Sequence, residues 1–326
     1  MKPKILHAPY NIVDIPRKIA CEFKKIGYIC DVMTFYDDHR KYDPPDYVLF
    51  GGNYENSKPS KIKLLKIIKF FFFAIIKYNI FQFHQRVTLL PNNLDILFIR
   101  FLRKKFYIYH HGSDVIGNDN YLKHVPHSKW AKEIFISTPD LYDFVPKSAI
   151  LIPQAISIDF LEKFRITNKV YRDCNVEKII ITHAVHSEAA MNHKGSFLIK
   201  EAIKELKSKG INLEFKLFIG DKHDKVLNEI AHADIHIDQM IYGWYGTISA
   251  EAMALGTPVL CYIREDLEKY ANNLPIFRGK KSELSKELLI LIRDVNLRKQ
   301  ISQKGMKYVK REHDANVIAK KLLKYY

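Results

Sequence analysis

The sequence predicts an α/β protein with two domains, and three observations lead to that prediction. The chain has 326 residues, which is enough for two domains of ordinary size. Short apolar runs fit for buried strands alternate along it with segments of helical periodicity, as in parallel α/β sheets. In residues 234–263 a strand enters a helix through a Gly-rich turn, and a second strand follows. We expect this stretch to be the centre of a ligand site.

The composition limits the classes of partner. Hydrophobic residues make up 47% of the chain, which is sufficient for two cores, and the formal charge of +16 indicates an acidic partner. A nucleic acid, an anionic membrane surface and a phosphorylated substrate all fit that charge. The cysteines show neither CxxC spacing nor the density of a disulfide scaffold, so we expect a reducing cytoplasm. The four are Cys21, Cys30, Cys174 and Cys261.

Neither a leader nor a membrane span is expected. The first residues, MKPKILHAPYNIVDIPRK, lack the uninterrupted apolar core of a signal peptide. No stretch approaches the run of about 18 uncharged apolar residues that a spanning helix needs. We therefore expect a cytoplasmic protein.

The first third of the chain alternates strands and helices. Residues 4–8, 30–35 and 47–50 are apolar runs fit for strands, and 16–26 has helical spacing that ends at Gly27. The pair Gly51-Gly52 then indicates a turn rather than a phosphate-binding loop. A first parallel sheet is therefore expected to begin at the start of the chain.

Residues 57–77 form a second informative stretch, SKPSKIKLLKIIKFFFFAIIK. On a helix its lysines share one side, and its apolar residues are mostly opposite. The lysines are Lys61, Lys63, Lys66, Lys69 and Lys77, and the apolar residues are Leu64, Ile68, Phe71, Phe72 and Ile75. This pattern suits a helix lying in an anionic membrane interface, and it also suits a surface helix packed on the first core. Four consecutive phenylalanines exceed what one core-facing stripe requires, which favours the membrane interpretation.

A polar segment follows a strand in the middle of the first domain. Residues 80–84 and 106–109 are strand-like, and the second run leads directly into His110-His111-Gly112-Ser113-Asp114. Carboxyl ends of parallel strands face the ligand site of such sheets. A metal site formed by His110, His111 and Asp114 is disfavoured, because adjacent histidines do not readily aim both rings at one ion. Further strands are expected at 134–137 and 149–152, and the charged residues 162–177 are expected to link the domains.

The second domain begins with an apolar strand at 178–184 that is expected to carry His183 to the site. Lys194-Gly195 precedes a helix over 196–209, a strand over 213–220 and a helix over 224–233. Terminal helices are expected at 283–292, 294–304 and 315–326.

The central stretch has the features of an anion site. Thr247 or Ser249 can cap its helix, and Gly256 and Pro258 end it. The first backbone N–H groups of a helix have no internal partners and carry the positive end of its dipole. Glu251 lies about one turn further in, where its carboxylate can accept hydrogen bonds from ligand hydroxyls.

The segment EAMALGTPV at 251–259, preceded by the Gly-rich turn, resembles the donor-site signature of GT-B glycosyltransferases of the retaining, family-4-like group. HHGSD at 110–114, HAVHSEAAMNHKG at 183–195, DQMIYGWYG at 238–246 and CYIRED at 261–266 occur in the order and spacing of that family. The resemblance covers most of residues 80–275. It implies the GT-B architecture, with two Rossmann-like domains facing each other across a crevice. The expected domains are 1–165 and 166–311, with a last helix at 312–326 packing back on the first.

The resemblance also implies roles for single residues. His111, with Asp114 as its companion, is expected near the transferred sugar and the acceptor, and Lys194 near the donor diphosphate. Glu251 is expected on the ribose, and the turn with Gly243, Gly246 and Thr247 in the donor site.

Three features of the donor site stay open. Many of these enzymes carry a glutamate where this chain has Gly243, and Asp238 is the nearest acid that could compensate. Either His186 or Arg264 could replace an arginine that the family commonly places before the lysine. Trp244 and Tyr245 fit a core position or a wall for the base or sugar.

The resemblance implies transfer of a sugar from a nucleotide-sugar donor to a glycan or lipid-linked acceptor in cell-surface polysaccharide synthesis. Retention, no metal and no cofactor beyond the nucleotide sugar are expected, as is a peripheral position on the inner face of the cell membrane through Lys61–Lys77. A sugar-nucleotide epimerase on the same fold is the first alternative. A nucleic-acid binder is disfavoured because the lysines lie on scattered helices without a recognised motif, and an NAD-dependent enzyme because no G-x-G-x-x-G follows the first strand.

Overall fold

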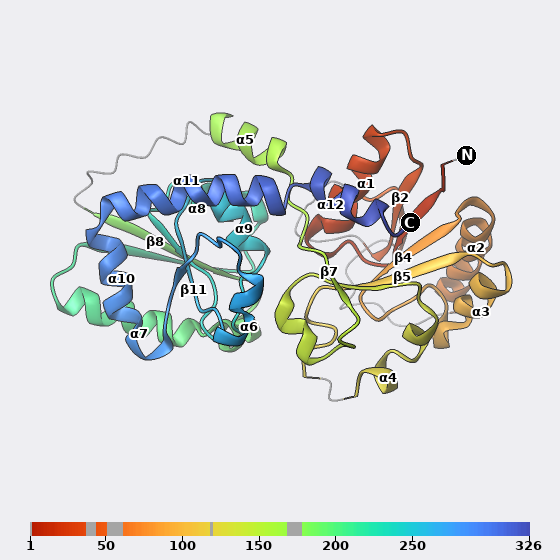
Figure 1. Ribbon diagram of the computed structural model, residues 1–326, viewed down its shortest axis with the longest axis horizontal. Coiled ribbons are helices and arrows are strands. Elements are labelled where there is room, and N and C mark those ends of the chain that lie inside the picture. The colour runs from red at the N-terminus through yellow and green to blue at the C-terminus, as the bar shows by residue number, and fades with distance from the viewer. Residues whose placement is uncertain (1, 37–43, 51–60, 118–119, 168–177) are drawn as a thin grey trace. The chain divides into compact units, whose positions relative to one another are not determined.

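The computed structural model describes residues 2–36, 44–50, 61–117, 120–167 and 178–326. The chain forms two compact units: Met1–Ala155 with Ala315–Tyr326, and Ile156–Asp314 (Figure 1). The division therefore falls earlier than the expected boundary after residue 165. The expected Gly51-Gly52 turn and most of the expected linker lie outside the described residues.

The first unit is built on a parallel sheet whose described strands run in the order β3-β2-β1-β4-β5-β6-β7. Its strands are β1 (Ile5–Ala8), β2 (Cys30–Tyr36), β3 (Tyr47–Phe50), β4 (Ile80–His84), β5 (Lys105–His110), β6 (Ile134–Ile136) and β7 (Ile150–Leu151). The chain adds strands on one side of β1 and then, from β4 on, on the other side. The order thus reverses between β1 and β4, and the carboxyl ends of two such strands frame the usual ligand position of an open α/β sheet.

Helices cover both faces of this sheet. They are α1 (Ile15–Lys25), α2 (Lys61–Lys77), α3 (Leu94–Phe101), the short α4 (Tyr121–His124) and α12 (Ala315–Leu323). Side chains alternate along β5: Tyr107 and Tyr109 join the core under α1 and α12, while Phe106 and Ile108 join the core under α2 and α3. The end of the chain is fixed on the first unit, since the Tyr326 hydroxyl donates to Gln82 Oε1 at 2.7 Å.

The second unit has a smaller parallel sheet with the described strand order β9-β8-β10-β11-β12. Its strands are β8 (Ile179–Val185), β9 (Leu213–Ile219), β10 (Ile235–Ile237), β11 (Val259–Cys261) and β12 (Phe277–Arg278). Its helices are α5 (Ile158–Thr167), α6 (Glu188–Lys194), α7 (Ser196–Ser208), α8 (His223–Ala231), α9 (Thr247–Ala254), α10 (Leu284–Arg293) and α11 (Val295–Glu312). Helices α8, α9 and α11 contribute to one core cluster, and α7 and α10 to the other. The strand order reverses between β8 and β10.

The predicted α/β class and its two Rossmann-like sheets are confirmed. Helix α6 was not expected; Gly195, at φ +72°, ends it and starts α7. None of the helices in the described ranges is long and apolar enough to cross a membrane.

Candidate active site

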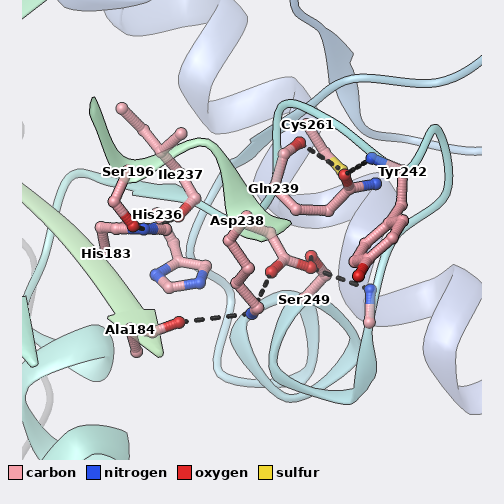
Figure 2. Close-up of polar contacts among 12 residues, drawn as sticks. His183, Ala184, Ser196, His236, Ile237, Asp238, Gln239, Tyr242, Ser249 and Cys261 are labelled. Atoms are coloured by element: carbon pink, nitrogen blue, oxygen red, sulfur yellow. Dashed lines mark hydrogen bonds and ion pairs between the residues drawn. The ribbon is translucent and has the colours of Figure 1, made fainter. Parts of the chain in front are cut away.

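Lys194 joins the two strands at which the second sheet reverses its order. Its Nζ donates to Asp238 Oδ1 at 2.6 Å and to the Ala184 carbonyl oxygen at 3.3 Å. Ala184 belongs to the carboxyl end of β8, and Asp238 directly follows β10 (Figure 2). An ammonium group has three N–H bonds, and the third has no acceptor among the described residues. A positive charge is therefore held at the expected ligand position of the sheet.

Asp238 is buried, and both of its carboxylate oxygens accept hydrogen bonds from groups of the protein. Its Oδ2 accepts hydrogen bonds from the Gly246 amide at 2.8 Å and from Ser249 Oγ at 2.6 Å. Burial on its own raises the pKa of this carboxyl, but Lys194, His236 and the bonded hydroxyl together lower the pKa below its ordinary value. Asp238 therefore stays charged and fixes both Lys194 and the start of α9. It was expected to contact the donor itself, but its side chain is buried and binds these protein groups instead.

The start of α9 is capped differently from the prediction. Gly246 is the N-cap residue, and neither Thr247 nor Ser249 caps the helix with its own side chain. The carboxylate of Asp238 binds the Gly246 amide from outside the helix instead. The amide groups that follow, beginning with Thr247, carry the positive end of the helix dipole.

Glu251 lies one turn into α9 and is only 2% exposed. Its Oε2 accepts a hydrogen bond from His223 Nε2 at 3.0 Å, and His223 is the first residue of α8. This contact joins α8 and α9, the helices that follow β9 and β10 at the same edge of the sheet. Sequence reasoning missed His223; the only signal for it is a histidine at the start of the helix after β9.

Gly243 has a structural reason to be glycine. Its φ is +92°, and an added Cβ would lie 2.4 Å from Arg264 Cγ. The Arg264 amide donates to the Gly243 carbonyl at 2.9 Å, and its guanidinium binds both oxygens of Asp266, at 2.9 and 2.6 Å. The aliphatic part of Arg264 thus occupies the space that a glutamate side chain at position 243 would need.

The two aromatic residues that were left open are core residues. Trp244 and Tyr245 are 7% and 5% exposed, and both join the core of the second unit. The Tyr245 hydroxyl bonds His313 Nε2 at 2.8 Å and the Tyr308 hydroxyl at 3.1 Å. The preceding turn is held by Gln239, whose Oε1 accepts from the backbone amides of Ile241 and Tyr242 at 3.0 and 2.6 Å (Figure 2).

His183 does not reach a ligand position, contrary to the expectation for this strand. Its Nδ1 donates to the Ile237 carbonyl at 2.8 Å, so the Nε2 of the neutral ring accepts from Ser196 Oγ at 2.7 Å. Burial, aided by Lys194, lowers the pKa of His183 to about 4. The neutral ring thus connects β8 with β10 and α7 through these two hydrogen bonds (Figure 2). His186, the other candidate for the missing arginine, is exposed at the end of β8.

In the first unit, His111 ends a line of three histidines. His84 Nε2 lies 2.8 Å from His7 Nδ1, and His84 Nδ1 lies 2.9 Å from His111 Nε2. The rings are stacked, with centroids 5.1 and 5.2 Å apart. His7 belongs to β1 and His84 ends β4, so the line lies where the first sheet reverses its order.

Asp114 forms its hydrogen bond with His110, so it accompanies the expected residue, His111, through its charge rather than through that bond. Its Oδ2 is 2.5 Å from His110 Nδ1, and His110 Nε2 is 2.8 Å from the Tyr121 hydroxyl. The two adjacent histidines thus bind different partners. In the ranges that the structure describes, no group of three or more His, Cys, Asp or Glu side chains is arranged to hold a metal ion.

Comparisons with known proteins identify the fold. No protein-family model matches the chain, and no curated protein matches its sequence. Among solved structures, sucrose-phosphate synthase from Thermosynechococcus elongatus has a TM-score of 0.63 at 14% identity, covering 100% of this chain and 98% of that one. WaaG, a glycosyltransferase involved in lipopolysaccharide biosynthesis, has a TM-score of 0.57 at 13% identity and covers 98% of both chains.

An epimerase is similar to the same extent. UDP-GlcNAc 2-epimerase from Neisseria meningitidis, bound to UDP-GlcNAc, has a TM-score of 0.59 at 14% identity and covers 100% of this chain and 99% of that one. These likenesses show that the chain has the GT-B fold. Since glycosyltransferases and epimerases share that fold, the fold by itself does not separate their reactions.

Proposed function

We propose that this protein is a glycosyltransferase that moves a sugar from a nucleotide-sugar donor to a glycan or lipid-linked acceptor in cell-surface polysaccharide synthesis. The observation that carries the proposal is Lys194, whose ammonium group is fixed by Asp238 at the strand reversal of the second unit. The proposal further takes the transfer to proceed with retention and without a metal, at the inner face of the cell membrane.

The donor diphosphate binds, in this proposal, at the start of α9 and against Lys194. Charge grows on the leaving nucleotide as the bond between the sugar and the diphosphate breaks. A lysine and helix amides that are already in place stabilise that charge without reorganisation. Glu251 binds the hydroxyls of the nucleotide ribose, and His223 holds its carboxylate in position. Lys194 and the amides thus take the role that a metal ion has in other enzymes.

The acceptor side belongs to the first unit in this proposal. His111 ends the histidine line and lies directly after β5, on a loop rather than within a helix or strand. With retention, the leaving phosphate assists deprotonation of the acceptor, and the new bond forms on the face that the nucleotide leaves. No protein nucleophile is then required.

An epimerase is the second candidate, because UDP-N-acetylglucosamine 2-epimerases are among the structures that this chain resembles. Epimerisation rearranges the sugar of the donor by proton transfer and needs no acceptor. Incubation of the purified protein with a nucleotide sugar alone separates the two reactions. An altered sugar without an acceptor supports the epimerase and overturns the transferase.

The decisive experiment is a panel of nucleotide sugars tested by thermal shift, since a ligand that binds the folded state raises the melting temperature. The donor that binds is then tested for transfer with wild type, Lys194→Ala and the control Lys200→Ala, which removes an exposed lysine of α7. We expect Lys194→Ala alone to slow transfer and a chelator to leave wild type active. Full activity of Lys194→Ala, or loss of wild-type activity with the chelator, contradicts the metal-free diphosphate site.

A further inference from the structure

Helix α2 has two different apolar faces. Phe70, Phe71, Ala74 and Ile75 are buried in the core of the first unit, so Phe71 and Ile75 do not belong to a free apolar face as the sequence suggested. A second stripe, which includes Lys69 and then has spacings of three and four residues, faces outward. Its large apolar members are Ile62, Leu65, Phe72 and Ile76, which are 70%, 57%, 52% and 84% exposed. The core interpretation of this helix thus accounts for only one of its faces.

Helix α3 exposes a similar stripe, which was not predicted. Leu94, Leu97, Phe98 and Phe101 follow each other at helical spacing and are 48%, 53%, 46% and 84% exposed. The opposite face of α3, with Ile96 and Ile99, is buried. Single exposed apolar residues are ordinary, but a complete exposed stripe on a helix of a folded unit indicates an interaction site.

The two stripes adjoin. The rings of Phe72 and Phe98 each lie 5.6 Å from the ring of Phe71, measured between centroids, so both flank the same core residue. Figure 1 shows α2 and α3 beside each other at one side of the sheet of the first unit. We call the exposed faces of α2 and α3 the two-helix surface.

The charge around the two-helix surface is strongly one-sided. From residue 61 to residue 105 the sequence holds ten lysines and arginines and one acidic residue, Asp95; one of the ten, Lys77, is paired with Asp31 of β2 at 2.8 Å. Asp95 is fully buried and binds the Thr88 hydroxyl and the Leu89 amide, so it presents no charge outward. Lys66 and Lys69 are exposed on α2, between the apolar residues of its outer stripe.

An exposed aromatic residue lies next to α3. The Trp130 ring is 37% exposed and has the guanidinium of Arg100 at 4.6 Å and the ammonium of Lys129 at 4.4 Å from its centroid. Tryptophan beside cationic side chains is typical of the level of lipid headgroups.

We propose that the two-helix surface docks this protein on the anionic face of a lipid bilayer, with both helices inserted shallowly. Apolar side chains enter the boundary between headgroups and acyl chains, and the surrounding lysines and arginines meet lipid phosphates. A second copy of this chain is a poorer occupant, because two such surfaces would bring the exposed α2 lysines of both copies together, and residues 61–105 hold no exposed acid to offset them. The inference deepens the proposed function by naming where a membrane-bound acceptor is met, but it depends on no catalytic residue.

Vesicle sedimentation tests the proposal with the full chain. Wild type is expected to sediment with vesicles of phosphatidylcholine and phosphatidylglycerol, less in high salt, and not with vesicles of phosphatidylcholine alone. The variant Leu97→Ser/Phe101→Ser is expected to lose this binding, because it removes half of the outer stripe of α3. The control Phe160→Ser/Phe197→Ser changes phenylalanines that are 46% and 51% exposed on the second unit, and it is expected to bind as wild type.

Three outcomes overturn the proposal: no binding of wild type to the anionic vesicles, full binding of the α3 variant, or equal loss in the control. If the α3 variant melts at a much lower temperature, vesicle binding of the charge variant Lys66→Gln/Lys69→Gln is measured instead. Its control is Lys204→Gln/Lys207→Gln on α7, and the proposal requires weaker binding of the α2 variant than of this control. Donor-induced thermal shift is measured on the same proteins without lipid. Retained docking without any donor binding would reject the proposed function alone, and retained donor binding without docking would reject this inference alone.

Discussion

Lys194 and Asp238 form an ion pair that ties α6 to the end of β10, with Nζ and Oδ1 2.6 Å apart. The carboxylate is fully buried, whereas the lysine side chain is 22% exposed. Because Asp238 also binds Gly246 and Ser249, one carboxylate sets both the position of the cation and the start of the helix beside it. The pair thus holds the candidate donor site in place, and replacement of Asp238 tests that arrangement.

Asp238→Asn is expected to lower the free energy of unfolding by about 2–4 kcal/mol, since it leaves a largely desolvated lysine without its counter-charge. The folded-state pKa of Asp238 lies below its unfolded value, so the stabilisation is present above about pH 4 and is lost as the pH falls further. Urea titration at neutral and at acid pH measures both effects. Asp221→Asn breaks a surface pair with Lys225 and serves as the control, with a loss of about 0–1 kcal/mol.

Glu251→Gln is expected to weaken binding of the nucleotide sugar by roughly 10- to 100-fold, because hydrogen bonds from ligand hydroxyls to a carboxylate are worth about 1.5–3 kcal/mol. Calorimetry with the donor found in the panel measures this affinity. Glu229→Gln, on neighbouring α8, makes the same chemical change in a pair with Lys216 and is expected to leave affinity unchanged. Equal affinities of Glu251→Gln and wild type would remove Glu251 from the donor site.

Gly243→Ala is expected to destabilise the protein by two separable causes. Positive φ costs a non-glycine residue about 1–3 kcal/mol, and the added Cβ also meets the side chain of Arg264. Gly210 has φ +78° with nothing within 4 Å of an added Cβ, so Gly210→Ala reports the first cause alone. Arg264→Ala in the Gly243→Ala background removes the contacts at 2.4 and 2.7 Å but keeps the Cβ at 3.0 Å, so it should recover at most the excess over Gly210→Ala. A double-mutant cycle by urea denaturation measures this, and absence of recovery would contradict the packing explanation.

Most strands and helices were predictable because they show their own local pattern, although α3, α5 and α6 were not predicted. Apolar runs and glycine or proline boundaries placed β1, β4, β8 and α9 near their observed positions. The GT-B fold followed from the motifs around residues 110–114 and 183–266, and it is confirmed by the solved structures.

The contacts within the site were not predictable, because they join side chains distant in sequence. Glu251 meets His223, and Arg264 fills the space above Gly243; neither fact is encoded in the spacing of the motif. His110 and His111 show the same limit at short range. The resemblance placed Asp114 beside His111, whereas in the structure the carboxylate of Asp114 bonds the ring of His110. Successive residues at a strand end point to opposite sides, so a motif that contains both histidines does not say which ring faces the acid.

The buried histidines make stability sensitive to mild acid. Burial lowers the pKa of His111 and His183 to about 4 and that of His7 and His236 to about 3. Unfolding returns each pKa to about 6.5, so the unfolded chain binds more protons, and stability is expected to fall as the pH drops from about 6.5 toward 4. His236→Gln should reduce this slope by up to about 1.4 kcal/mol per pH unit. The same change at exposed His232 is the control; equal slopes in all three proteins would refute the assignment.

From the hydrogen bonds in the histidine line, we predict that His84 sets the orientation and the tautomer of His111, the residue proposed to act beside the acceptor. A neutral imidazole has one N–H, so if His84 donates to His7 it must accept from His111, and the reverse direction reverses every bond in the line. His84 therefore sets whether Nδ1 of His111 is a donor or an acceptor. His111→Ala should slow transfer by about 100-fold or more while donor affinity stays near wild type, as expected for a residue outside the second unit.

His84→Phe keeps a ring in the stack and removes both hydrogen bonds. It should lower kcat less than His111→Ala and change the pH profile of transfer, which a purely structural ring would not do. His127→Phe, at a buried histidine whose ring nitrogens have no partner among the described residues, is the matched control and should leave that profile unchanged. If His84→Phe shows the wild-type kcat and pH profile, the line is structural and His111 acts without it.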